Sequence, residues 1–242
     1  MDSLLSIVVI SVIGPILGSF IGVIRKPSRR FMYNMLSFAA GVMLGLSFIS
    51  MIPHAVKLSS PETCAAGILL GAIVMYFLDK LIPHVHPEMF KEEPGSEFKK
   101  TALYLIVGIF LHNFPEGMAI GAGSVADSKV SIMIALAIAI HNIPEGICTS
   151  APYFHATGKR WKAFLLSSTT SIPILVGYFV AHALYKSIPG EVIGLMIAAT
   201  AGIMIYISAD ELIPTSSFKL TNHSTIFSLI LGVIFVVLLG LA

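Results

Sequence analysis

Two copies of one polar hexapeptide interrupt the apolar stretches of this 242-residue sequence. The copies read His112-Asn113-Phe114-Pro115-Glu116-Gly117 and His141-Asn142-Ile143-Pro144-Glu145-Gly146. In a helix, a histidine and the glutamate four residues later project from one face, and an asparagine three residues before the glutamate lies on the same side. Two such helices that face each other would bring together two imidazoles, two carboxylates and two amides.

This donor set predicts a divalent-metal site. A carboxylate in hydrocarbon costs about 2.5 to 3.5 kcal/mol on insertion scales, so each glutamate needs a partner or a water-filled cavity. Lysine and arginine occur only near the ends of the apolar stretches, which leaves a bound cation as the simplest counter-charge for Glu116 and Glu145. Imidazole with carboxylate suits zinc, iron(II), manganese, cobalt or cadmium, whereas oxygen-only cages suit magnesium or calcium. Buried pairs that only hold helices together explain one copy, but not two with matching proline and glycine.

The proline of each copy predicts a bend in its helix. Pro115 and Pro144 have no amide hydrogen to donate to the carbonyl four residues earlier, so that carbonyl is freed at the level of the donors. Each freed carbonyl offers a further oxygen ligand or a site for water. The glycines that follow, Gly117 and Gly146, permit close approach of a neighbouring helix.

The elements that must position these donors are membrane-spanning helices. Hydrophobic residues make up 56% of the chain and charged residues 12%, and the mean hydropathy is +0.89, which excludes an ordinary soluble domain. Apolar stretches of the length that crosses a bilayer predict an all-α membrane protein in which residues 1–242 form one transmembrane domain. The eight expected spans are 4–24, 31–56, 62–83, 101–123, 129–151, 161–186, 191–213 and 221–241. The first stretch lacks a basic leading region and a cleavage site, so we expect a retained helix.

Loop charges predict the orientation. With both termini extracytoplasmic, twelve of the lysines and arginines fall on the cytoplasmic side and three on the outer side, in agreement with the preference of these residues for the cytoplasm. The longest loop, 84–100, is then cytoplasmic and contains histidines and acidic residues. Composition alone leaves open whether this loop handles metal through His84 and His86 or is a solvated connector.

An internal repeat relates the two halves of the chain. Residues 41–53 match residues 202–214 without a gap, and Pro15-Ile16-Leu17 matches Pro173-Ile174-Leu175. The hexapeptide itself occurs in the fourth and fifth spans. Helices 1–3 and 6–8 therefore form repeats around the 4/5 pair, and the loop charges make the matched helices run in opposite directions. Inverted repeats of this kind are typical of transporters.

On these residues the chain resembles the ZIP (Zrt/Irt-like) divalent-metal transporters, and most of all their GufA-like bacterial-type branch. The resemblance covers all eight helices. Its most specific parts are the two hexapeptides, supported by Asp79-Lys80-Leu81-Ile82-Pro83-His84 and Asp210-Glu211-Leu212-Ile213-Pro214. It implies a mid-membrane metal site, sometimes binuclear. One subsite would use His112, Glu116, His141 and Glu145, with Met43 as a soft ligand. The other subsite would use Asn113, Glu116, Asn142 and Glu145.

The chain departs from the family pattern at Ser171. Related binuclear sites take a further glutamate just before the Ile172-Pro173 step, and a serine cannot supply that charge. The resemblance therefore implies a second subsite that is weaker, empty or filled only transiently. It also implies an inward release path along Asp79, His84, His86, Asp210 and Glu211, while His54 could receive metal from outside. Ordinary interfacial roles for Asp79 and Glu211 stay open on the sequence.

Together these features predict an uptake transporter rather than an enzyme, working by alternating access in the cell membrane. The expected transported substrate is Zn²⁺, with Cd²⁺, Fe²⁺, Mn²⁺ and Co²⁺ as related cargoes. The expected partners are this metal ion and the lipid bilayer, with a homodimer left open and no nucleic acid. The main alternative is a membrane-embedded metal-dependent enzyme, which would need an open coordination position and a separate acid or nucleophile. A metal sensor or chaperone would retain its ion tightly and show no flux.

Overall fold

The computed structural model describes residues 3–81, 96–126, 128–184, 189–217 and 223–240 of the chain. Within these ranges every regular element is helical, which confirms the predicted all-α class. Each expected span coincides with one helix or with a run of adjoining helices. The elements are α1 (Ser3–Ile24), α2 (Arg29–Gly45), η1 (Leu46–Met51), α3 (Ile52–Leu58), α4 (Pro61–Leu81), α5 (Ser96–Ala126), α6 (Ser128–Thr157), α7 (Arg160–Ser168), η2 (Thr169–Ser171), α8 (Ile172–Leu184), α9 (Gly190–Ile207), η3 (Ser208–Leu212), α10 (Ile213–Ser217) and α11 (Ser224–Gly240).

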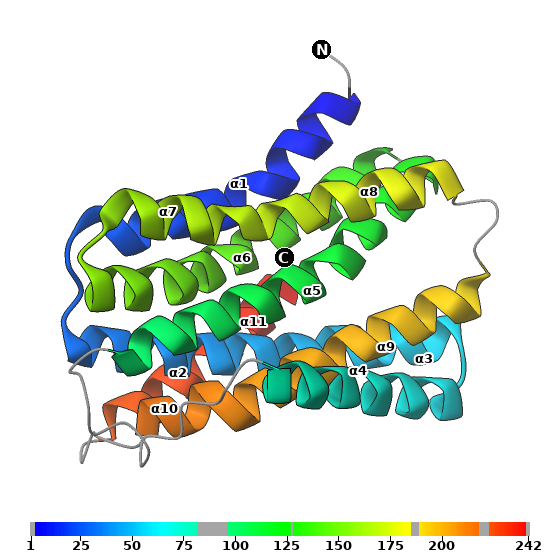
Figure 1. Ribbon diagram of the computed structural model, residues 1–242. Coiled ribbons are helices and arrows are strands. Elements are labelled where there is room, and N and C mark those ends of the chain that lie inside the picture. The colour runs from blue at the N-terminus through cyan, green and yellow to red at the C-terminus, as the bar shows by residue number, and fades with distance from the viewer. Residues whose placement is uncertain (1–2, 82–95, 127, 185–188, 218–222, 241–242) are drawn as a thin grey trace.

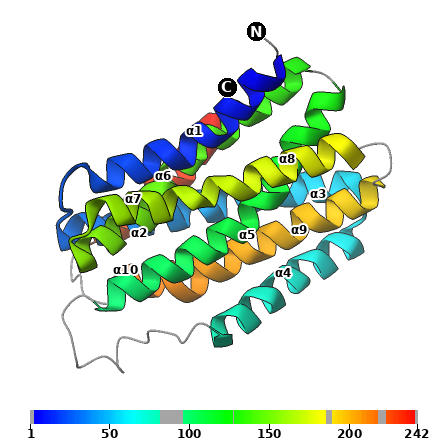
Figure 2. The same cartoon turned by 45° about the horizontal axis from the view of Figure 1, so that its top comes forward.

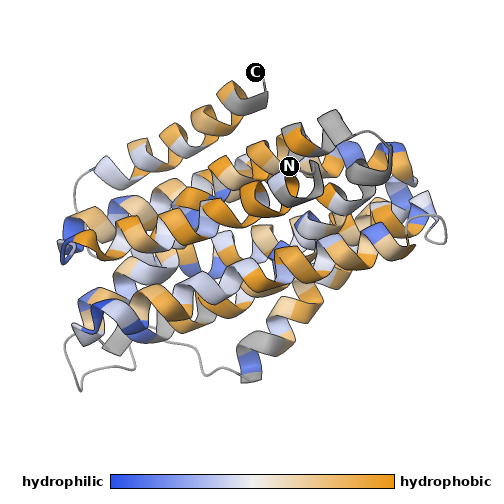
Figure 3. Cartoon of the chain, turned by 90° about the horizontal axis from the view of Figure 1, so that it is seen from above, coloured by the Kyte–Doolittle hydropathy of each residue, from blue (hydrophilic) through white to orange (hydrophobic). Residues whose placement is uncertain are grey.

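Two helices extend well beyond the expected spans: α5 begins five residues earlier than residue 101, and α6 ends six residues later than residue 151. Helical hydrogen bonding continues there into polar residues that the apolar pattern leaves out. Among the described residues, four helical segments are long and apolar enough to cross a membrane, and they are Ser6–Ile24, Arg29–Leu58, Arg160–Leu184 and Gly190–Ser217. Apolar residues predominate along the helices, and the most polar ones gather mostly toward the helix ends (Figure 3). This distribution is the one expected of helices surrounded by lipid.

The helices run side by side in two bundles (Figures 1 and 2). In the motif bundle, α1 packs along α6, α8 packs along α5, and α5 and α6 pack on each other, with α7 beside α1. In the flanking bundle, α4 packs along α9 and α2 packs along α11. The bundles meet where α2 touches α6 and α5 touches α9. Exchanging α1 with α8, α2 with α9, α4 with α11 and α5 with α6 maps these contacts onto one another, as the sequence repeat predicts.

Glycines allow the closest helix contacts, and they do so at matched positions. A Cβ at Gly41 of α2 would fall on the carbonyl oxygen of Leu229 in α11. A Cβ at Gly202 of α9, the repeat partner of Gly41, would fall on the carbonyl oxygen of Ile68 in α4. Apolar helices gain little hydrophobic free energy from packing on each other in lipid, so close backbone approach supplies much of their association.

Substitution of Gly71 by alanine should therefore destabilise the flanking bundle. Its Cβ would collide with the backbone carbonyl of Ala199, which cannot rotate away, so α4 and α9 must separate. Overpacking of this kind costs about 1–3 kcal/mol. The matched control is Gly190→Ala, because the nearest atom to that Cβ is 3.6 Å away, an ordinary contact. Thermal unfolding of the purified variants in detergent measures the difference, and equal midpoints would contradict this account of the packing.

Candidate metal centre

The polar side chains of the two hexapeptides lie in the interior of the motif bundle. His112, Asn113 and Asn142 are fully buried, and Glu116 and Glu145 are 7% and 1% exposed. They occupy the middle of α5 and α6, which continue as helices through Pro115 and Pro144.

The imidazole of His112 links the two helices. Its Nε2 atom lies 3.4 Å from Glu116 Oε1 on the same helix and 3.5 Å from Glu145 Oε2 on α6. In the other direction across the pair, Asn142 Nδ2 donates a hydrogen bond of 3.2 Å to Glu116 Oε2. The helical spacing of the motifs thus brings an imidazole, two carboxylates and an amide together, as predicted for these four residues.

Several buried polar atoms of this cluster have no hydrogen-bond partner among the described residues. They include His112 Nδ1 and the side-chain oxygens of Asn113 and Asn142. Leaving a buried polar atom unsatisfied costs about 1–3 kcal/mol, so such atoms mark a place where water or a ligand belongs. Imidazole nitrogen and amide oxygen are both able to bind a divalent transition metal.

The donors do not form a complete coordination shell on their own. No group of three or more His, Cys, Asp and Glu side chains that could hold a metal ion occurs within the described part of the chain. His141 lies on α6, but its side chain is outside the described part, so its predicted role as the second imidazole stays a prediction.

Asn113 points to a neighbouring helix instead of the shared carboxylates. Its Nδ2 atom donates a 2.6 Å hydrogen bond to the carbonyl of Thr170 in η2. This carbonyl is available because Pro173 has no amide hydrogen to donate to it within the 3-10 turn. Next to it, Ser171 Oγ donates to the carbonyl of Ser168 at 2.7 Å. The side chains of Asn113 and Ser171, which the family resemblance places at the expected second subsite, therefore both donate to backbone carbonyls.

Met43 lies on α2, in the apolar cluster where the two bundles meet. Its side chain is 1% exposed, and the cluster includes Met75, Leu105, Cys148 and Met204. Both cysteines of the chain, Cys64 and Cys148, are free and buried. The Cys148 sulfur donates a 3.2 Å hydrogen bond to the carbonyl of Met35 on α2, which joins one bundle to the other. The structure places Met43 beside the motif helices, and its role as a ligand stays a prediction.

Two residues of the expected release path lie in an unusual helical turn. Asp210 and Glu211 belong to η3, a π-helical segment, where Asp210 is exposed and Glu211 is 6% exposed. Thr215 Oγ1 donates to Glu211 Oε1 at 3.4 Å. His54, the expected outer residue, is exposed on α3. Asp79 lies on α4 with its side chain outside the described part, and residues 84 and 86 fall outside it entirely.

Sequence reasoning missed the π-helical turns and the Thr170 carbonyl. The turns η1 and η3 occupy matched positions of the repeat, each just before the Ile-Pro step that ends the matching segments. Single π turns inside α-helices occur frequently at functional sites. Pro53, Pro173 and Pro214 were the available signals, because each removes a backbone donor and loosens the preceding turn.

Comparison with known proteins agrees with this arrangement. The family described as "ZIP Zinc transporter" matches residues 1–102 and 85–240. The zinc transporter ZupT of Salmonella heidelberg (strain SL476) is 35% identical over 225 residues, which cover 89% of this chain and 87% of that protein. The zinc transporter ZupT of Salmonella newport (strain SL254) matches with the same identity and coverage. Both relatives are named as zinc transporters. With its long apolar helices, this chain is a multi-pass membrane transporter rather than an enzyme, and it belongs to the ZIP zinc transporter family.

Proposed function

We propose that this protein moves Zn²⁺ or a related divalent transition metal into the cytoplasm through a site formed by His112, Glu116, His141 and Glu145. The position of His112 Nε2 between two carboxylates in the bundle interior is the observation that carries the proposal. Two carboxylates balance the charge of one divalent cation, and neutral imidazoles add nitrogen ligands of the type zinc prefers. Family membership and the names of the relatives support zinc as cargo.

One bound ion suits this cluster better than two. The hydrogen bond from Asn113 to Thr170 and the turned-back hydroxyl of Ser171 leave the second subsite without a third carboxylate. Asn142 remains beside Glu116, where its free oxygen could complete the first subsite. Met43 is the candidate soft ligand on the flanking bundle. Asp79, His84, His86, Asp210 and Glu211 would release the ion inward, and His54 would meet it outside.

Transport would proceed by alternating access through eight spans with both termini extracytoplasmic. The symmetric contacts of the bundles support an inverted repeat. The basic α1–α2 and α6–α7 connections lie at one end of the molecule, opposite the α3–α4 connection, which supports this orientation (Figure 1). Mostly apolar side chains separate the motif bundle from the flanking bundle, a surface along which one bundle could move against the other.

Zinc uptake into liposomes tests the proposal. The purified chain, reconstituted with a zinc-sensitive dye inside the vesicles, should give saturable uptake, with cadmium, iron(II) and manganese as competitors that define selectivity. A metal-dependent enzyme would give no flux. A sensor or chaperone would bind zinc tightly, also without flux, so either result would reject transport.

Ser171→Glu should add a second bound ion per chain. A carboxylate at this position would border the Asn113 side of the cluster and supply the charge that the serine lacks. Ser171→Gln is the matched control, because it adds similar volume without the charge. Elemental analysis of protein equilibrated with zinc measures the stoichiometry. An unchanged count in the glutamate variant would show that more than this charge is missing from the second subsite.

A further inference from the structure

Seven cationic side chains crowd two short connections at one end of the molecule. Residues 25–30 and 159–162 contain no aspartate or glutamate, and all seven lysine and arginine side chains there are exposed. They are Arg25, Lys26, Arg29, Arg30, Lys159, Arg160 and Lys162. We call this surface the basic rim.

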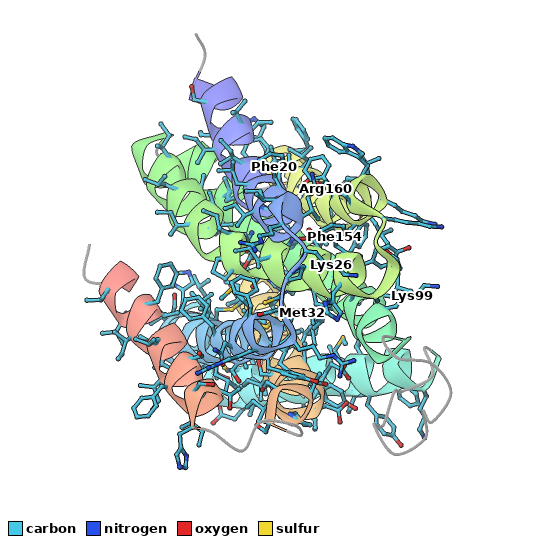
Figure 4. All side chains as sticks on the ribbon, turned by 90° about the vertical axis from the view of Figure 1, so that its left-hand side faces the viewer. Phe20, Lys26, Met32, Lys99, Phe154 and Arg160 are labelled. Atoms are coloured by element: carbon cyan, nitrogen blue, oxygen red, sulfur yellow. The ribbon has the colours of Figure 1, made fainter. Side chains whose placement is uncertain are left out.

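The two connections are tied to each other. Arg160 Nη2 donates a 3.1 Å hydrogen bond to the carbonyl of Ile24 at the end of α1. His155 Nδ1 lies 3.0 Å from the carbonyl of Pro27, which connects the end of α6 to the segment before α2. The guanidinium of Arg160 also lies over the Phe154 ring, 5.6 Å from its centroid. Figure 4 looks onto this end, where Arg160, Phe154 and Lys26 lie near one another in the view.

Among the described residues, no ion pair joins a carboxylate to a lysine or arginine of the basic rim. The N-terminus of α7 adds to the positive potential, because its capping residue Lys159 makes no side-chain hydrogen bond to the first amides. Like charges held this close repel one another, so an anion bound among them would stabilise the arrangement.

An exposed apolar face adjoins the basic rim. Phe20 of α1 and Trp161 and Leu165 of α7 are 48%, 65% and 63% exposed. The Phe164 ring stands edge-on between two of them, with its centroid 6.2 Å from that of Phe20 and 6.1 Å from that of Trp161. Trp161 is the only tryptophan of the chain, and this residue type favours the level of lipid headgroups.

We propose that the basic rim and this aromatic face form a binding site for an anionic phospholipid. The phosphate would lie among the cations, and the acyl chains would lie along Phe20, Trp161 and Leu165. Basic residues near span ends are expected on the cytoplasmic side of any membrane protein. That preference does not explain why the two connections are hydrogen-bonded to each other, or why an exposed aromatic face adjoins them. The orientation proposed above places this site in the cytoplasmic leaflet, where anionic lipids attract basic segments. The site is independent of the metal cluster.

Native mass spectrometry of the full chain, titrated with phosphatidylglycerol or phosphatidylcholine, tests the proposal. The wild-type protein should retain phosphatidylglycerol preferentially. Arg25→Gln/Lys162→Gln should weaken that binding by roughly 25-fold, since each basic residue near the headgroups contributes about fivefold. The matched control is Lys57→Gln/Lys80→Gln, which removes the same charge from exposed lysines elsewhere and should leave binding unchanged. None of these four side chains holds the loops together, and unfolding midpoints without anionic lipid check the fold.

A second variant separates a lipid from a soluble anion. Trp161→Ala should weaken phosphatidylglycerol binding without changing the charge, and inorganic phosphate should fail to displace the lipid. Equal retention of both lipids, or equal losses in the rim and control variants, would overturn the proposal. Displacement by inorganic phosphate together with unchanged binding in Trp161→Ala would also overturn it, in favour of a soluble anion.

Discussion

Glutamine in place of Glu145 should reduce zinc flux by about 100-fold or more. Mutation of a residue that only hydrogen-bonds to a metal ligand lowers metal affinity by about 10–100-fold. Removal of the charge of a ligand itself should therefore lower the affinity by at least the upper end of that range. Glutamine preserves the volume of this side chain, which is 1% exposed, so the change removes charge without leaving a cavity. Liposome uptake measures the flux, and Glu116→Gln should behave in the same way.

Stability measurements distinguish a metal ligand from a structural pair. If the contact between His112 and Glu145 only held α5 to α6, removal of one partner from a buried pair would destabilise the protein by about 3–5 kcal/mol. If Glu145 is a ligand, the metal-free variant should be no less stable than the wild type, because one of two carboxylates beside the same imidazole has been neutralised. Zinc should then stabilise the wild type, by about 2.7 kcal/mol at 100 times the dissociation constant, and fail to stabilise the variant.

Glu191→Gln is the control for these measurements. Glu191 is an exposed carboxylate that accepts a hydrogen bond from Thr63 at 3.3 Å, far along the sequence from either motif. Its neutralisation should leave flux and the zinc-dependent stabilisation intact. Normal flux in Glu145→Gln, or the same loss in Glu191→Gln, would remove the basis for assigning the site to the motif carboxylates.

The sequence was sufficient to predict that α5 and α6 bring motif side chains together, as observed for His112, Glu116, Asn142 and Glu145. Helical spacing fixes the relation of His112 to Glu116, and the cost of a carboxylate in hydrocarbon favours an arrangement in which the two motif helices turn their glutamates toward each other. The contact between His112 and Glu145 follows from these facts together with burial. Spacing within a motif does not say which third helix will contact it, so the bond from Asn113 to Thr170 was not predictable from the hexapeptide.

Departures of the backbone from α-helical geometry were harder to predict from the sequence than side-chain positions. The ungapped match of residues 41–53 with 202–214 predicted that α2 and α9 would be equivalent, and both contain a π-helical turn before the matching proline. A proline removes one backbone hydrogen bond of the helix. Whether the helix then forms a bend, a 3-10 turn or a π turn depends on the packing around the proline. In such a turn, Glu211 is buried while Asp210 is exposed. The sequence does not show which of these two adjacent carboxylates is buried.

A disulfide between the two bundles should stop transport. The Cys148 sulfur lies 3.2 Å from the backbone carbonyl of Met35, and the Met35 side chain packs against the apolar cluster that contains Cys148. Met35→Cys, in a background with Cys64→Ala, is therefore the variant chosen to cross-link α2 to α6. Oxidation with diamide should tie α6 to α2, and zinc uptake should fall to the level of empty liposomes. Dithiothreitol should restore it, since reduction of the bond frees the bundles again.

A disulfide within the motif bundle is the matched comparison. The hydroxyl oxygens of Ser19 on α1 and Ser167 on α7 are 2.6 Å apart, so cysteines at these two positions can form a bond without joining the bundles. With Cys148→Ser and Cys64→Ala, this oxidised variant should transport at its reduced rate, because the helices it joins move as one unit. If oxidation of Met35→Cys leaves flux unchanged despite a complete cross-link, the ion passes through a fixed path and alternating access by movement of the bundles is wrong. If both cross-links stop flux, the moving unit is smaller than the motif bundle, and the hinge must lie among α1, α6 and α7.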